Sequence, residues 1–171
     1  MMKDMETKLK TTTEYMGKVK NIISASDLYL KTEIEVGESL IENDITWLKF
    51  ISNGKILLVA DRCIKNRISW NQIHEQKCVF GKVITINNVD YLCRLLTSAE
   101  WDKLIVKYTP LDVDSHWKRT YTWCQNKTMY AKKNDLTYRV FRGYSTVSGF
   151  IYYTSSYVYT FCGWRPVLEL L

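Results

Sequence analysis

Two pairs of short hydrophobic runs, each pair separated by turn residues, predict antiparallel hairpins in the first half of the chain. In residues 46–60 the pair Asn53-Gly54 interrupts two runs rich in β-forming side chains. Asn-Gly favours a two-residue hairpin turn because both of its positions need positive φ. Residues 83–95 repeat the pattern with Asn87-Asn88 at the turn.

Two short helices are predicted from their N-terminal caps. Ser69 is suited to cap a helix that ends near residue 76. The sequence Thr97-Ser-Ala-Glu100 has the form of a capping box, and its helix is expected to end near Tyr108, before Pro110. Helical spacing places four apolar side chains on one face of this second helix: Trp101, Leu104, Ile105 and Tyr108.

Further strands are expected at residues 120–124, 138–141 and 164–171, the last as a central strand because it is largely apolar. Strands joined as hairpins and accompanied by two short helices predict an α+β fold dominated by antiparallel pairing. Residues 39–171 form the predicted domain.

Residues 1–38 are polar and weakly periodic, and are expected to form an arm, helical or extended, that serves as a possible assembly segment. A loose apolar stripe along this arm suggests packing or oligomer docking by the side chains of Met5, Leu9, Tyr15, Met16 and Val19.

The segment from Tyr144 to Cys162 has no charged side chain, and of its 19 residues five are Tyr and seven are Ser or Thr. Tyr with Ser and Gly is the composition of recognition surfaces, since Tyr offers a large amphipathic contact area. Tyr, Val, Ile and Thr are also good strand formers, so the segment fits a pair of β-strands equally well. The two interpretations are compatible.

Net charge and hydropathy limit the classes of partner that we expect this protein to bind. The net charge of +6 favours anionic partners, but the basic residues are scattered, which argues against specific reading of nucleic acid. No run approaches the roughly 18 apolar residues of a membrane helix, and the N-terminal residues lack the apolar core of a secretory signal. We therefore expect no membrane insertion and synthesis in a cytosol.

The five cysteines are spread widely and contain no Cys-x-x-Cys pair. A zinc site needs clustered Cys and His ligands, so we expect no metal and no cofactor. Buried free thiols are the default interpretation.

Six short motifs, taken in order, resemble a known domain: Trp47-Leu-Lys-Phe50, Ile68-Ser-Trp-Asn71, Glu100-Trp-Asp102, Tyr121-Thr-Trp-Cys-Gln125, Arg139-Val-Phe-Arg-Gly-Tyr144 and Gly163-Trp-Arg-Pro-Val-Leu-Glu-Leu170. Their order is similar to the C-type-lectin-like domain of phage tail and virion structural proteins. The similar branch includes formylglycine-generating enzymes and phage tropism-determinant proteins. The resemblance covers residues 40–171.

The resemblance implies a frame built from a Trp-Cys segment, an Arg-Gly turn after a strand, and a final Gly-aromatic-Arg-Pro strand. On this basis we expect structural roles for Trp101, Trp123, Arg142, Gly143, Trp164 and Arg165. A buried Arg165 would need carbonyl or carboxylate partners, for which Glu169 is a candidate.

Enzymes of that branch use two cysteines near the C-terminal strand. Here Cys162 has only Cys124 as a conceivable mate, without the expected close spacing, and the calcium-dependent sugar-binding pattern of animal lectins is absent. Ser115 and His116 beside Asp114 are neighbours in sequence only, whereas a triad is spatial. No catalytic residues are therefore predicted.

In the phage proteins that the chain resembles, partner contacts lie on loops before the final strand. The matching candidates are Tyr144, Tyr153, Tyr157 and Tyr159, with Trp117 and Arg119 extending the surface. Strand alternation would place Tyr153, Tyr157 and Tyr159 on one face and Tyr152 on the other.

Two functions follow as hypotheses. The first is a non-enzymatic, homo-oligomeric virion protein of the tail or baseplate, which binds other virion proteins, a host cell-surface glycan or teichoic acid. The second is a small phage protein in the host cytoplasm that binds and inhibits a bacterial defence protein.

Overall fold

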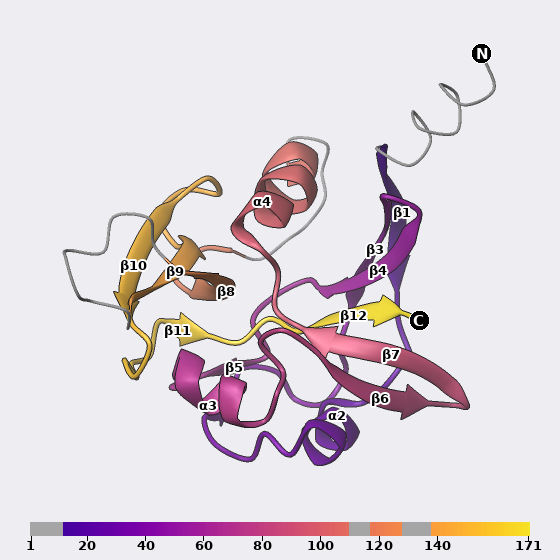
Figure 1. Ribbon diagram of the computed structural model, residues 1–171, viewed down its shortest axis with the longest axis horizontal. Helices are drawn as coiled ribbons and strands as arrows, with labels where there is room; N and C mark the ends of the chain where they lie inside the picture. The colour runs from indigo at the N-terminus through magenta and orange to yellow at the C-terminus, as the bar shows by residue number, and fades with distance from the viewer. Residues whose placement is uncertain (1–11, 110–116, 128–137) are drawn as a thin grey trace.

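The computed structural model describes residues 12–109, 117–127 and 138–171, which form two separate sheets, a two-stranded ribbon and short helices (Figure 1). The larger sheet is antiparallel throughout and has the strand order β1-β3-β4-β12-β7-β6. In that order its strands are Thr13–Val19, Trp47–Ser52, Lys55–Ala60, Val167–Leu170, Val89–Arg94 and Lys82–Ile86.

The smaller sheet has the order β10-β9-β8-β11 and lies at the opposite end of the long axis from β1 (Figure 1). Its strands are Phe150–Thr154, Tyr138–Gly143, Tyr121–Lys127 and Cys162–Gly163. Only β11 pairs in parallel, with β8. The ribbon pairs β2 (Glu38–Ser39) with β5 (Lys65–Asn66). The fold is thus α+β and mostly antiparallel, as predicted.

Both predicted hairpins are confirmed. The first turn has positive φ at Asn53 (52°) and Gly54 (76°), and the second at Asn87 (49°) and Asn88 (65°). These are the conformations that Asn and Gly tolerate at lowest cost. The apolar C-terminal strand is also central, since β12 lies between β4 and β7.

The two predicted helices are present with their predicted caps. Helix α3 (Trp70–Glu75) begins after a capping box of Ser69, and α4 (Ser98–Glu100) after the capping box of Thr97. The second helix continues as a six-residue π-helix, η1 (Trp101–Val106), which the sequence does not predict. Its expected apolar face is buried at Trp101, Leu104 and Ile105; Pro110 lies outside the described residues.

Residues 12–38, the described part of the predicted N-terminal arm, do not form an arm with a helical apolar stripe. Residues 13–19 form edge strand β1, in which Tyr15 packs on Phe50 with ring centroids 5.4 Å apart, while Met16 is 46% exposed. A third helix, α2 (Ala25–Thr32), buries Leu28 in the core. The packing of residues 13–38 is therefore continuous with the predicted domain; Met5 and Leu9 fall outside the described residues.

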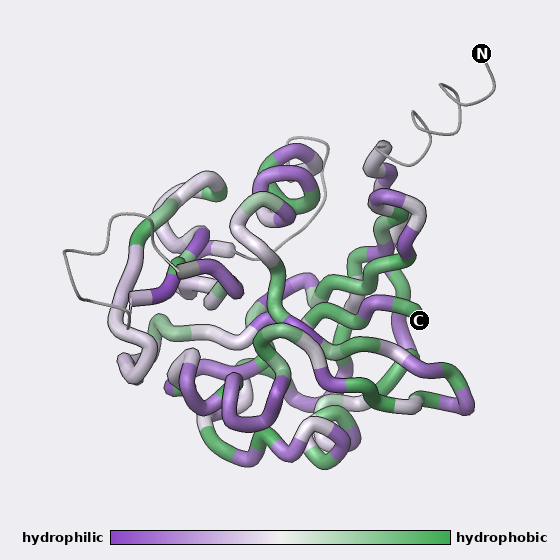
Figure 2. The backbone as a smooth tube through the Cα atoms, viewed as in Figure 1, coloured by the Kyte–Doolittle hydropathy of each residue, from purple (hydrophilic) through white to green (hydrophobic). Residues whose placement is uncertain are grey.

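Side chains on the two faces of the large sheet pack into two different hydrophobic clusters. Trp47 and Leu168 enter the larger cluster with Trp123 and Trp164, whereas the next residues along the strands, Leu48 and Val167, face the helix η1. Figure 2 shows the corresponding hydrophobic colouring of the central strands. Burying one such aromatic or aliphatic side chain contributes about 1.5–3 kcal/mol.

Arg165 connects the two sheets just before β12. It is fully buried; its Nη1 donates a hydrogen bond to the carbonyl of Ala60 (3.1 Å) and its Nε to Oγ1 of Thr122 on β8 (3.3 Å). The expected pairing with Glu169 is wrong, because that carboxylate accepts hydrogen bonds from Lys55 and Arg94 instead. Burial lowers the pKa of Arg165.

Candidate functional site

Six aromatic rings gather beside the smaller sheet around Phe161. Its ring centroid lies 5.0–6.0 Å from those of five tyrosines: Tyr121, Tyr144, Tyr153, Tyr157 and Tyr159. We call these six residues the Phe161 cluster. All six keep part of their surface accessible, unlike the tryptophans beneath them.

Strands and a tight turn bring these rings together from distant positions. Tyr121 projects from β8 and Tyr153 from β10, which are separated by β9. The chain then turns, with the amide of Tyr157 donating to the carbonyl of Thr154 (2.9 Å). A second turn closes with the amide of Cys162 donating to Tyr159 (3.1 Å) and delivers Phe161 next to β8.

Within the cluster the rings form two stacks. In the first, Tyr153 lies nearly parallel to Tyr157 (4.6 Å, 12°), which in turn faces Tyr159 (6.3 Å, 22°). In the second, Tyr121 lies between Tyr144 (4.7 Å, 16°) and Phe141 (5.2 Å, 21°). The faces of the inner rings therefore pack against neighbouring rings. Each such aromatic pair stabilises the fold by about 0.5–1.5 kcal/mol beyond the effect of burial.

The outer member of each stack is the most accessible ring. Tyr144 is 37% exposed and Tyr159 52% exposed. Between described residues, the hydroxyls of the five cluster tyrosines make no hydrogen bond. Burial, aided by neighbouring phenols, raises the pKa of Tyr121 and Tyr157, so both hydroxyls remain protonated donors at neutral pH.

Arg142 fixes the loop that carries Tyr144. This side chain is 4% exposed; its Nε donates to the carbonyl of Gly149 (2.9 Å), and the other guanidinium nitrogens donate to Ser98 Oγ (2.9 Å) and Asp102 (2.6 Å). The indole of Trp101 donates to the carbonyl of Val147 (2.7 Å). The loop is thus fastened to the start of the α4–η1 helix.

Gly143 makes the turn into this loop possible. Its φ is +89°, and a Cβ here would lie 3.3 Å from the ring of Trp101 and from the carbonyl of Trp117. A side chain would meet both strain and crowding at this position. Tyr144 itself has φ +82° and is held by hydrogen bonds with the backbones of Trp117 and Arg119.

The chain segments that carry the cluster contain basic but no acidic residues. Residues 117–127 and 138–168 contain six Lys or Arg residues and no Asp or Glu. Arg119 is exposed and its amide donates to the carbonyl of Tyr144, while the amide of Arg67 donates to the carbonyl of Tyr159. Basic residues therefore adjoin both exposed ends of the cluster.

The thiols near the C-terminal strand are unsuited to nucleophilic chemistry. Burial raises the pKa of Cys124 and of Cys162 to about 12, and raises that of Cys63 as well. At neutral pH such thiols hold their protons and react slowly, because the thiolate is the nucleophile. Across residues 12–109, 117–127 and 138–171, no three His, Cys, Asp or Glu side chains converge as metal ligands do.

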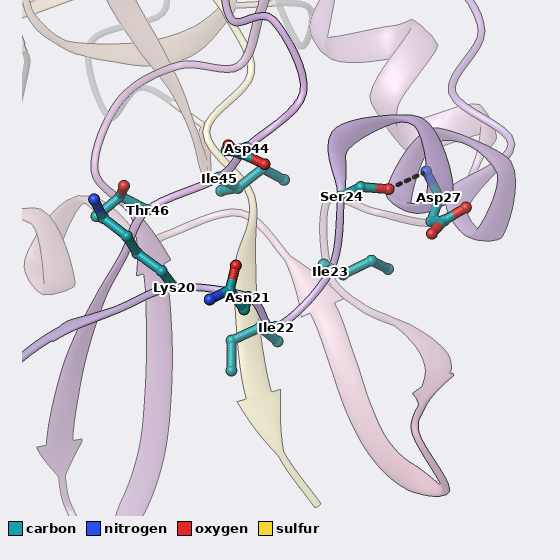
Figure 3. A pocket seen from close by; sticks show the side chains of 9 residues that line it. All are labelled: Lys20, Asn21, Ile22, Ile23, Ser24, Asp27, Asp44, Ile45 and Thr46. Carbon is teal, nitrogen blue, oxygen red and sulfur yellow. Dashed lines mark hydrogen bonds between the residues drawn. The ribbon is translucent and has the colours of Figure 1, made fainter.

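A cavity of about 330 Å³ lies far from these residues in the fold, between the segment after β1 and the segment before β3 (Figure 3). Lys20 and Asp27 lie on opposite sides of it, with Asp44 between them, and Ser24 caps α2 at its edge. Its charged side chains are exposed to solvent, and it holds no arrangement that suggests catalysis.

The four tyrosines predicted as partner contacts lie together in the Phe161 cluster. Tyr153 lies in β10, but Tyr157 and Tyr159 reach the same side through turns, because β10 ends at Thr154 and strand alternation does not extend to them. Tyr152 contacts Phe150 instead. Arg119 adjoins the cluster.

Two other placements were not predicted. The half-buried Trp117 packs against the hydrophobic cluster under η1, and among the described residues it makes no ring contact with the Phe161 cluster. Tyr121 and Phe161 were missed, although Phe161 touches every other ring. Their sequence signal was an aromatic residue flanking a strand, which ordinary core packing also produces.

The residues expected to form the frame are all buried: Trp101, Trp123, Arg142, Gly143, Trp164 and Arg165. In the part of the chain that the structure describes, every helix is too short or too polar to cross a membrane. No protein-family model matches this chain, and no curated protein matches it.

Proposed function

We propose that this protein is a non-enzymatic binding module of a phage virion, part of the tail or baseplate, with a C-type-lectin-like domain. The observation that carries the proposal is the Phe161 cluster: its phenols are partly exposed and make no hydrogen bond to any described residue, and a basic residue neighbours each end of the cluster. Tyr combines apolar area with hydrogen bonding at low conformational cost, which suits recognition.

The arrangement of the family-like motifs supports the fold assignment. The Trp-Cys segment, the Arg-Gly turn and the final Gly-Trp-Arg-Pro strand meet in space, since Trp123 packs on Phe141 and Arg165 bonds to Thr122. The candidate contacts lie in loops before the final strand, as in the phage proteins that the sequence resembles.

The position of the cluster also suits attachment. Figure 1 shows β1 and the smaller sheet at opposite ends of the molecule. A homo-oligomer held through the β1 end would present its Phe161 clusters outward, toward a host surface or another virion protein. The expected location is the virion.

Particle composition tests this proposal. Mass spectrometry of purified virus particles is expected to find the protein, and light scattering is expected to find an oligomer. Particles carrying Tyr159→Ala should either fail to incorporate the protein or adsorb poorly to cells, whereas the control Phe150→Ala, on the other face of β10, should do neither. The proposal would be wrong if the protein proved monomeric and were absent from purified particles.

One observation favours a second function. All five cysteines are free and buried, which suits a protein that works in the reducing host cytoplasm. The chain would then bind and inhibit a bacterial defence protein through the same cluster. Pull-down from host lysate should recover such a partner and lose it with Tyr159→Ala; recovery of structural proteins alone would count against this function.

A further inference from the structure

We infer that the Phe161 cluster binds a polyol-phosphate chain, that is, a polymer of hydroxyl-rich units joined through phosphate. This inference rests on the proposed binding function and narrows its ligand. Three features carry it: which ring faces are free, where hydroxyls gather, and how charge is distributed.

Among the described residues, the exposed rings of the cluster are Tyr144 and Tyr159. Tyr157 and Tyr121 are inner members of their stacks, whereas Tyr144 and Tyr159 are outer members and the most exposed rings of the cluster. Phe161 lies between these two end rings. The cluster can therefore pack against apolar C–H surfaces of a ligand at two separated points.

Many of the accessible side chains in and around the cluster carry hydroxyl groups. Five phenol groups have no hydrogen-bond partner among the described residues, and five exposed side chains of the same segment add more: Ser145, Thr146, Ser148, Ser156 and Thr160. Each hydroxyl can both donate and accept. A ligand with many hydroxyls of its own matches this surface better than one with extended apolar area.

Charge supplies the third constraint. With no acidic residue in residues 117–127 and 138–168, an anionic ligand meets no repulsion from these segments. The backbone amides of Arg119 and Arg67 donate to the carbonyls of Tyr144 and Tyr159, so a basic residue neighbours each end residue of the cluster in the fold. The guanidinium of Arg67 forms only an exposed ion pair with Glu38 (3.2 Å), which contributes little and can be exchanged for a phosphate.

These features favour a polyol phosphate over single-stranded nucleic acid. Successive bases bind by stacking on successive open aromatic faces. Here Tyr121 and Tyr157 stack on neighbouring rings, and the two exposed rings, Tyr144 and Tyr159, both contact Phe161. In a polyol phosphate, the phosphates would pair with the arginines, and the hydroxyls between the phosphates would hydrogen-bond to the phenols.

The test is direct binding of the full chain to a fluorescent glycerol-phosphate oligomer, measured by polarisation. Binding is expected to weaken as salt rises and to fall at least about tenfold in Tyr159→Ala and in Tyr144→Ala, equivalent to 1.4 kcal/mol. Arg119→Gln should weaken it about threefold or more. Phe150→Ala and Arg62→Gln are matched controls that should bind normally, and circular dichroism should show every variant folded.

Competitors separate the alternatives. Dextran, neutral but rich in hydroxyls, and polyglutamate, anionic but without a polyol, should both compete poorly, as should oligothymidylate of matched charge. Equal competition by polyglutamate, tighter binding of oligothymidylate, or no binding of the oligomer would each overturn the inference. If Tyr159→Ala impairs the particles but the wild-type chain does not bind the glycerol-phosphate oligomer, the inferred ligand class is wrong and the proposed function still holds.

Discussion

Glu169 on the central strand β12 accepts a hydrogen bond from Nε of Arg94 on β7 at 2.9 Å, and each side chain is only 8% exposed. Lys55 on β4 donates to the other carboxylate oxygen at 2.6 Å, and Arg94 also binds Glu100 in the helix cap. Burial raises the pKa of Glu169, but the hydrogen bonds and charges of Lys55 and Arg94 outweigh it, so the net pKa is lowered.

This lowered pKa predicts a loss of stability in acid. Glu169 stabilises the fold fully above its unfolded pKa of about 4.3, and the contribution disappears as the pH falls through its lower folded pKa. Glu169→Gln should reduce the free energy of unfolding at neutral pH by about 2–3 kcal/mol. Urea titrations at several pH values should also show less acid sensitivity in this variant.

The exposed Glu33, paired with Lys82 at the surface, supplies the control for that measurement. Glu33→Gln should leave the stability at neutral pH nearly unchanged. Acid sensitivity of Glu169→Gln equal to that of the wild type would contradict the prediction.

Gly143→Ala is expected to destabilise the protein more than Gly54→Ala. Both glycines have positive φ, but a Cβ at Gly54 meets nothing within 4 Å, whereas at Gly143 it meets Trp101 and the Trp117 carbonyl at 3.3 Å. We expect a loss of about 1 kcal/mol at Gly54 and about 2–3 kcal/mol at Gly143. Thermal unfolding of the two variants measures the difference, and equal losses would show that crowding is unimportant.

Arg142→Lys should loosen the loop of residues 144–149 although the charge is kept. A lysine cannot reproduce the fork that reaches Gly149, Ser98 and Asp102 together. The expected cost is about 2–3 kcal/mol. Faster hydrogen exchange at the amide of Gly143, which donates to the carbonyl of Gly149, should accompany it. Arg62→Lys, at a partly exposed ion pair with Asp61, is the control with little expected effect.

The five thiols should resist alkylation until the protein unfolds. All are buried, and burial raises the pKa of Cys124 and Cys162 to about 12. Only Cys78 has a lowered pKa, because Cys93 donates a hydrogen bond to it, so it should react first. Mass spectrometry after iodoacetamide should show no adduct on the native chain and five in urea. Rapid native labelling of Cys162 would contradict the prediction and would indicate a reactive thiol, as in the two-cysteine enzymes of the branch that the sequence resembles.

The sequence predicted those features whose conformation depends on residues close together in the chain, such as turns and helix caps. Turn residues such as Asn53-Gly54 and caps such as Ser69 fix their own backbone, so the hairpins and the starts of two helices followed from the sequence. Strand β1 and helix α2 were missed because their apolar positions are sparse. Their partners, β3 and the core around Trp47, lie far along the chain and supply most of the stabilisation.

The candidate site was predicted in part for the same reason. Composition identified four of its tyrosines, since a charge-free Tyr and Ser segment is visible in sequence. Their common side depends on the turn at Thr154, and the central place of Phe161 depends on the parallel pairing of β11 with β8. Neither relation leaves a local signal, because both join residues across the fold.

The uneven charge has a consequence for how the molecule approaches a partner. Apart from the six basic residues in residues 117–127 and 138–168, the chain carries 18 basic and 18 acidic residues, so the entire formal charge of +6 belongs to those segments. Those segments contain strands β8 and β9 of the smaller sheet, so this part of the protein carries a net positive charge. A negatively charged surface will attract these segments, which favours approaches that bring the Phe161 cluster toward it.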